Sequence, residues 1–134
     1  MADSLQISLS GLKAQSQRLA AASSNIANLT SSGVNPDSQA ASGPEVFKPL
    51  KVSQSAVSPA GGTTATISQD ENGTLLVFDP SSPFADENGS VAVPNISLEK
   101  EITDLLATKI AYKANTLALR TESEIQKNLI DELS

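Results

Sequence analysis

Proline and glycine are confined to the middle of this chain, and their distribution constrains its fold more than any other feature. All seven prolines and six of the seven glycines lie within residues 33–94, and only Gly11 falls outside. Proline interrupts a helix because it lacks a backbone donor and clashes with the preceding turn, and glycine weakens a helix by its flexibility. The sequence therefore predicts two helical ends, 1–30 and 96–134, around a turn-rich insertion, 31–95.

The first segment carries a heptad pattern, which predicts a helix over about residues 4–30. Asp3 and Gln6 form a capping-box pattern at its start, and Gly33 followed by Pro36 signals its end. A second row of the heptad is mostly small or polar, so neighbouring backbones should approach this helix closely. The first row is Leu5, Leu12, Leu19 and Ile26, and the second is Ser8, Gln15, Ala22 and Leu29.

The last segment repeats leucine and isoleucine at helical spacing, which predicts one helix over residues 98–133 with Ser97 as its N-cap. Glu99 and Glu101 fall in the first turn, where negative charge suits the helix dipole. The apolar positions cover more than one face, which predicts more than one neighbour. They are Leu98, Ile102, Leu105, Leu106, Ile110, Leu117, Ile125, Leu129 and Leu133.

The insertion carries signals for β-structure and for loops. Residues 63–68 and 74–78 are β-branched or apolar runs separated by a turn containing Asn-Gly, which predicts a β-hairpin. Residues 46–52 form a candidate edge strand interrupted by a proline, and residues 91–93 form a candidate weakly paired strand. Residues 30–44 are rich in Ser, Gly, Asn and Pro, which predicts a loop that is flexible or ordered by a partner.

Together these patterns predict a mostly α fold. Two long terminal helices would pair as an antiparallel coiled-coil hairpin, with a small β-hairpin and loop insertion between them. Two helices alone leave apolar faces in water, and the insertion is acidic and poor in bulky side chains. We therefore expect partner molecules to cover the helices, with helix formation coupled to association.

The composition disfavours most catalytic and ligand-binding chemistry. Cys and His are absent, which removes thiolate and imidazole metal sites, cysteine nucleophiles and Ser-His pairs. No glycine-rich phosphate-binding motif is present. The net charge of −6 disfavours nucleic acid and anionic membrane surfaces. We expect no catalytic, cofactor-binding or metal site, no enzyme activity, no small-molecule substrate, no nucleic-acid partner and no direct membrane insertion.

Neighbouring carboxylates are the remaining candidates for acid–base chemistry. The tetrapeptide Asp-Glu-Asn-Gly occurs twice, at residues 70–73 and 86–89, without the ligand spacing of an EF-hand loop. We interpret the two copies as twin turns. A carboxylate-pair hydrolase is the weakest alternative function, and a saturable activity lost on changing Asp86 or Glu122 would support it.

Two motifs at opposite ends of the chain resemble those of a known family. Residues 19–28, with the core Ser-Asn-Ile-Ala-Asn, resemble the N-terminal signature of the flagellar axial proteins, which are the rod and hook subunits. Residues 112–115 resemble their C-terminal Tyr-x-Ala-Asn motif. Residues 79–95 are similar to the segment before the last helix in a proximal-rod subunit, although Ser90 stands where the family usually has Tyr.

The resemblance implies a structural subunit of the proximal rod in the bacterial flagellar basal body. Such a subunit is exported through the flagellar type III apparatus without a cleaved signal. It assembles helically in the periplasm with copies of itself and other rod proteins, and the rod transmits torque. Another axial subunit of the rod or hook remains an alternative. A soluble helical adaptor or secretion chaperone is a second alternative, which cooperative helicity in the isolated monomer would favour.

The predicted assembly interface combines the helical seams with the motif residues. The three asparagines among them would fix the helix register by hydrogen bonding, or else cap turns or face water. The interface residues are Leu5, Leu12, Leu19, Asn25, Ile26, Asn28, Ile102, Leu106, Ile110, Tyr112, Asn115, Leu117 and Ile125.

Overall fold

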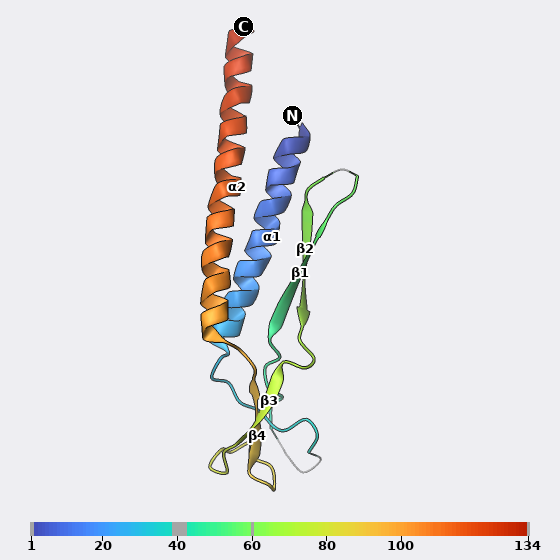
Figure 1. Cartoon of the computed structure of the whole chain (residues 1–134), viewed down its shortest axis with the longest axis vertical. Coiled ribbons are helices and arrows are strands. Elements are labelled where there is room, and N and C mark those ends of the chain that lie inside the picture. Colours follow the sequence, from blue (N-terminus) through green and yellow to red (C-terminus); the bar gives the residue numbers. More distant parts are fainter. Residues whose placement is uncertain (1, 39–42, 60, 134) are drawn as a thin grey trace.

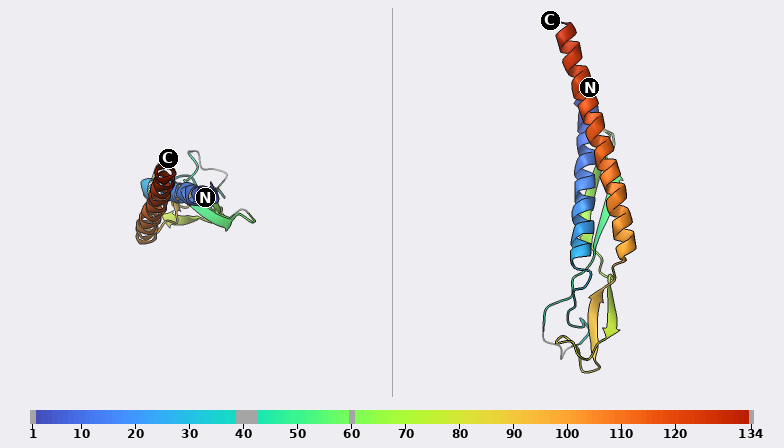
Figure 2. Two further views of the ribbon diagram at one scale, coloured as in Figure 1. Left: turned by 90° about the horizontal axis from the view of Figure 1, so that it is seen from above. Right: turned by 90° about the vertical axis from the view of Figure 1, so that its left-hand side faces the viewer.

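The computed structural model describes residues 2–38, 43–59 and 61–133 of the 134-residue chain. Helices α1 and α2 lie side by side, the β1–β2 hairpin runs along α1, and the β3–β4 sheet lies beyond the end where α2 begins (Figures 1 and 2). Over the described residues the elements are α1 (Ala2–Ala27), β1 (Leu50–Ala56), β2 (Thr63–Gln69), β3 (Thr74–Phe78), β4 (Ser90–Pro94) and α2 (Leu98–Glu132).

Helix α1 lies closer to the N-terminus than the sequence pattern indicates. It begins at Ala2, so Asp3 lies within the helix and the predicted N-cap is wrong. It ends at Ala27, well before Gly33. Asn28 donates to the Ser24 carbonyl twice, from its backbone N–H at 3.2 Å and from Nδ2 at 2.8 Å. A side-chain bond of this kind competes with the helical ladder, and the chain turns there.

Helix α2 matches its prediction closely. The Ser97 Oγ accepts a hydrogen bond from the Lys100 N–H at 3.4 Å, which confirms the predicted N-cap. The backbone N–H of Glu99 and the Ser97 hydroxyl hold the pKa of the Glu99 carboxyl below its usual range. The 35 residues of the helix correspond to about 52 Å. Ser4 near the start of α1 donates to Glu122, and α2 continues to Glu132 beyond this contact (Figure 1).

The strands predicted at 63–68 and 74–78 are present as β2 and β3, but the predicted pairing between them is wrong. β2 pairs antiparallel with β1, from Leu50↔Gln69 to Ala56↔Thr63. β3 pairs antiparallel with β4, which contains the predicted strand 91–93. The described residues of the insertion therefore form two separate two-stranded sheets in place of the predicted β2–β3 hairpin.

The backbone of the Asn-Gly turn explains why β2 and β3 do not pair. A tight type I′ hairpin needs positive φ at both central residues, and neither Asn72 nor Gly73 has it. The Gly73 N–H instead donates to the Asp70 carbonyl at 3.0 Å, and the Gly73 carbonyl accepts from the Asn95 N–H at 2.8 Å. The turn thus passes the chain from the first sheet to the second.

The candidate edge strand at 46–52 is displaced, because β1 begins only at Leu50, after Pro49. The preceding loop, predicted over 30–44, is partly ordered by two isolated bridges, Gly33↔Ala92 and Val34↔Glu45. A Cβ at Gly33 would lie 2.4 Å from the Val46 nitrogen, so this close approach requires glycine. Residues 39–42 of the predicted loop lie outside the described residues.

The buried core is thin. Over the described residues, no buried apolar side chain is larger than valine. The accessible surface is 8900 Å², whereas a compact monomer of this mass exposes about 6600 Å². The single chain thus leaves much of its surface uncovered. The buried apolar residues are Ala14, Ala21, Ala22, Val46, Val91 and Ala92.

The interpretation of residues 70–73 and 86–89 as twin turns is confirmed. The Asn72 N–H donates to Asp70 Oδ1 at 3.2 Å, and the Asn88 N–H donates to Asp86 Oδ1 at 2.9 Å. In the first turn Asp70 also pairs with Lys51 Nζ at 2.6 Å. Asp86 also accepts from the Asn35 amide and from the Ser90 N–H, each at 2.9 Å.

These donors, the Asn35 amide foremost, hold the pKa of Asp86 below its usual range. The stability that this carboxylate contributes is complete above its unfolded pKa of about 3.9 and is lost as the pH falls through the lower folded value. We predict that the Asn88 and Ser90 amide signals in ¹⁵N–¹H NMR titrate together with a midpoint below about 3.9. The Asp86→Asn variant should lack this transition, and its persistence there would contradict the assignment.

Candidate assembly surface

The contact between α1 and α2 is built from small and polar side chains. Four α1 residues at heptad spacing meet α2, and each precedes a residue of the predicted leucine row by one position. They are Ser4, Gly11, Arg18 and Asn25. Arg18 lies 3.9 Å from Asp104, and a Cβ at Gly11 would lie 3.0 Å from the Asn115 amide. The remaining two contacts join Ser4 to Glu122 and Asn25 to Glu101. The buried face of α2 is equally small, since Thr108 is its fully buried residue over the described range.

Asn25 joins three elements and is only 2% exposed. Its Nδ2 donates to the Leu50 carbonyl of β1 and to Glu101 Oε1 of α2, each at 3.0 Å. Its Oδ1 accepts from the Leu50 N–H at 2.7 Å. The amide therefore uses both of its ends to hold α1, β1 and α2 in one register.

The β1–β2 hairpin is held against α1 at its far end as well. The Thr63 N–H donates to Ser10 Oγ at 3.0 Å, and Ser10 Oγ donates in turn to the Ile7 carbonyl at 2.7 Å. Gly62, with φ +90°, packs against Ser10 so closely that a Cβ there would lie 2.6 Å from its hydroxyl. One side of α1 is thus covered by the hairpin and another by α2 (Figure 1).

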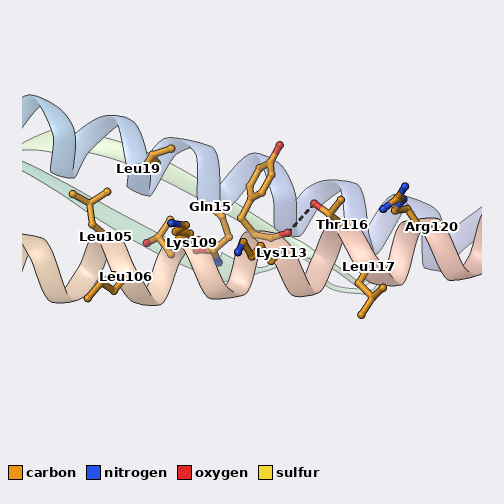
Figure 3. Close-up of a pocket in the computed structure, with 11 residues that line it drawn as sticks. Gln15, Leu19, Leu105, Leu106, Lys109, Lys113, Thr116, Leu117 and Arg120 are labelled. Atoms are coloured by element: carbon orange, nitrogen blue, oxygen red, sulfur yellow. Dashed lines mark hydrogen bonds between the residues drawn. The ribbon is translucent and has the colours of Figure 1, made fainter.

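The predicted interface residues divide by exposure. On α1, Leu5, Leu12 and Ile26 are half-buried and Leu19 is exposed. On α2 every predicted apolar residue is exposed, between 43% and 70%. Figure 3 shows Leu106 and Leu117 turned away from α1. The exposed set on α2 comprises Ile102, Leu106, Ile110, Tyr112, Leu117 and Ile125.

The motif asparagines take different positions. Asn25 is buried, and Asn115 is half-buried against Gly11. Asn28 is half-buried and bonds back to its own helix at Ser24. In the single chain, therefore, two of these amides lie between elements and the third closes the end of α1.

A groove of about 810 Å³ lies beside the exposed face of α2, and sequence reasoning did not find it. Gln15 and Leu19 line it from α1, and Leu105, Leu106 and Leu117 are among its α2 lining (Figure 3). The Gln15 Oε1 is buried without a hydrogen-bond partner in the described chain. The sequence signal that could have indicated this groove is the set of cationic side chains on α2 that line it. They are Lys109, Lys113 and Arg120.

The described residues contain little that could act as a reaction or metal centre. No group of three or more acidic side chains there is placed to hold a metal ion. Both carboxylates of the hydrolase alternative make structural contacts, Asp86 within its turn and Glu122 with Ser4. In the same part of the chain, neither helix is long and apolar enough to cross a membrane.

Comparison with known proteins defines the class first. A family model described as "Flagella basal body rod protein" matches residues 5–33, which include most of α1 and the turn after it. The match contains the Ser-Asn-Ile-Ala-Asn motif and confirms the resemblance to the axial proteins.

Curated relatives then identify the family over most of the chain. The "Flagellar basal-body rod protein FlgC" of Salmonella typhimurium (strain LT2) is 34% identical over 113 residues, which cover 84% of this chain and 82% of the relative. The protein of the same name in Bacillus subtilis (strain 168) is 32% identical, with 94% of each chain covered. That of Agrobacterium fabrum (strain C58) is 31% identical, with 96% and 91% covered. The chain belongs to the FlgC family of flagellar basal-body rod proteins.

The geometry at Asn25 predicts a large effect of its removal. Asn25→Ala leaves the Leu50 N–H without its acceptor and should lower the free energy of unfolding by about 2 to 4 kcal/mol. Asn28→Ala removes a bond at a half-buried helix end and should cost about 1 kcal/mol or less. Urea unfolding followed by circular dichroism measures both. Equal losses in the two variants would contradict the role assigned to Asn25.

Proposed function

We propose that this chain is a structural, non-catalytic subunit of the proximal rod in the bacterial flagellar basal body. It assembles helically with copies of itself and with other rod proteins, and the assembled rod transmits torque. Membership of the FlgC family supports the rod assignment. The exposed apolar face of α2 carries the argument for assembly.

The exposed face of α2 carries several large apolar side chains that the single chain does not cover. Leu106, Ile110 and Leu117 lie on the side of α2 opposite the buried Thr108, whereas Tyr112 lies one turn from Thr108, at the edge of this face. Burial of one such Leu or Ile side chain by a neighbour contributes about 1.5 to 3 kcal/mol. Several of these side chains on one helix therefore provide a strong driving force for lateral association. A rod under torque needs this kind of extended lateral contact.

The two helices of each subunit would pair as an antiparallel coiled-coil hairpin. The heptad spacing of the α1 contacts supports this pairing, because a seven-residue repeat keeps one face of a helix against its partner. The order of those contacts supports the same arrangement. Ser4 meets Glu122 near the end of α2, whereas Asn25 meets Glu101 near its beginning.

The predicted interface residues would then serve three purposes. The exposed apolar side chains of α2, together with Leu19, would face neighbouring subunits. The half-buried side chains Leu5, Leu12 and Ile26 would complete the seam when neighbours close over α1. Asn25, Asn28 and Asn115 would keep the helices in the register that presents this surface.

The division of the chain follows from the same reasoning. Residues 1–30 and 96–134 would form the assembly domain, and residues 31–95 would form its insertion. We place the assembled subunit in the periplasmic part of the basal body, after export through the flagellar type III apparatus without a cleaved signal. A core of alanine and valine supports this route, because a weakly stabilised chain is readily kept unfolded for export.

A charge on the exposed face should block assembly without unfolding the chain. Leu19→Asp and Leu117→Asp each place a carboxylate where a neighbour would bury it, at a cost of several kcal/mol. Both side chains are exposed in the single chain, so its helicity in circular dichroism should be unchanged. We expect at least about a tenfold loss of incorporation into purified basal bodies, which corresponds to about 1.4 kcal/mol.

Ser123→Asp is the matched control, because it adds the same charge at an exposed polar position of α2. Complementation of a strain that lacks its own copy of the subunit would report swimming as well as incorporation. Normal rods from both leucine variants would refute the assembly surface. Failure of the Ser123 variant as well would show that added charge alone disturbs the rod.

A further inference from the structure

Strand β3 carries an exposed apolar surface that the helical assembly surface does not explain. Leu75, Leu76, Val77 and Phe78 follow one another and are all exposed, with Phe78 at 74%. In most two-stranded sheets one face of a strand is covered, so exposed apolar side chains alternate with buried ones. Here both faces of β3 are open. The strand lies at the end of the molecule away from the free ends of the helices (Figure 1).

The backbone of β3 has one edge without partners. In an antiparallel pair, the residues that exchange hydrogen bonds alternate with those that do not. The bonds from Asn95 N to Gly73 O and from Asp79 N to Gly89 O place Leu75 and Val77 in the bonded positions. The N–H and C=O groups of Leu76, at the centre of the strand, therefore point away from β4.

The other edge of this sheet is already covered. The Gly33 N–H donates to the Ala92 carbonyl, and the Ala92 N–H donates to the Gly33 carbonyl, both at 3.0 Å. Gly33 thus occupies the outer side of β4. The edge at Leu76 is the one that remains open in the described part of this sheet.

β3 lacks the features by which proteins usually protect an edge strand. Such strands carry charged side chains, proline or a bulge that prevents pairing with another chain. Thr74–Phe78 has no charge and no proline, and its register with β4 is unbroken. By contrast, the edge strand β1 carries Lys51 and several polar residues.

The charges around β3 indicate which strand would fit. Between Lys51 and Lys100 the chain has no basic residue, and Asp79, Asp86 and Glu87 follow β3. The turn before β3 is already neutralised, because Lys51 Nζ lies 2.6 Å from Asp70 and Lys48 Nζ lies 2.6 Å from Glu71. Over the described residues, Asp79, Asp86 and Glu87 have no such cationic partner. Pairing of β3 with β3 of a second copy, antiparallel and centred on Leu76, would place this neutralised turn beside Asp79, whereas a basic residue there would stabilise the pair of strands.

We propose that the open edge of β3 is a docking site for an extended strand of another protein, apolar at its centre and basic at the end that lies beside Asp79. The main-chain groups of Leu76 would bond the incoming strand, and apolar side chains on both faces would cover those of β3. The site is separate from the α2 face, so it stands independently of the helical assembly surface.

A synthetic peptide tests the proposal on the full chain. The probe is fluorescently labelled Lys-Thr-Val-Ile-Val-Thr-Lys, and binding is followed by anisotropy at low salt. Leu76→Pro removes the outward N–H and leaves the bonded positions Leu75 and Val77 in place. We expect saturable binding that weakens at least about tenfold in Leu76→Pro and changes less than about twofold in Leu76→Val. A tenfold change corresponds to about 1.4 kcal/mol.

Two further peptides keep the result decisive if proline disturbs the sheet. With the unchanged chain, a Glu-flanked peptide and a peptide N-methylated at its three central residues should each bind at least about tenfold more weakly. Absence of saturable binding, equal binding of all three peptides, or binding unchanged by Leu76→Pro would overturn the proposal. Self-association of the chain that Leu76→Pro abolishes would also overturn it, in favour of β3 pairing between copies.

Discussion

The close packing of α1 on α2 through small and polar residues determines most of this structure. Gly11, Thr108 and Asn25 let the two backbones approach, and none of them supplies apolar bulk. A helix that uses its small face internally must present its larger apolar side chains elsewhere. Most leucines and isoleucines of α2 therefore remain at the surface of the single chain, which is the basis of the proposed assembly surface.

The insertion is coupled to this helix pair through few but specific contacts. Asn25 bonds β1 at Leu50 and α2 at Glu101, so the register of the hairpin depends on the register of the helices. The second sheet is joined instead through Gly33 and the turn at Gly73. The helix pair thus presents one surface, and β3 presents another at the opposite end (Figure 2). Under the two proposals made above, these surfaces would contact different neighbours.

Sequence patterns located most elements but not their partners. The bounds of α2, its Ser97 cap and the runs that form β2, β3 and β4 were accessible from spacing and turn residues, because these are local properties. Both ends of α1 and the start of β1 were misplaced. The pairing of β2 with β3 was predicted from Asn72-Gly73, and it failed because the backbone there does not adopt the required positive φ. The seam of α1 was predicted at the leucine row. The observed contacts lie one position earlier, since close helix packing favours Gly11 over Leu12.

The sequence by itself determined that the two ends are helical, that the middle is not, and that the chain belongs among the axial proteins of the flagellum. These conclusions rest on proline placement, periodicity and short motifs, which need no knowledge of distant contacts. Only the tertiary structure decided which side of each helix is used internally, that Asn25 bonds two other elements, and that β3 has an open edge. Such features depend on residues far apart in the chain, whose mutual distances are set by packing and backbone geometry and not by local pattern.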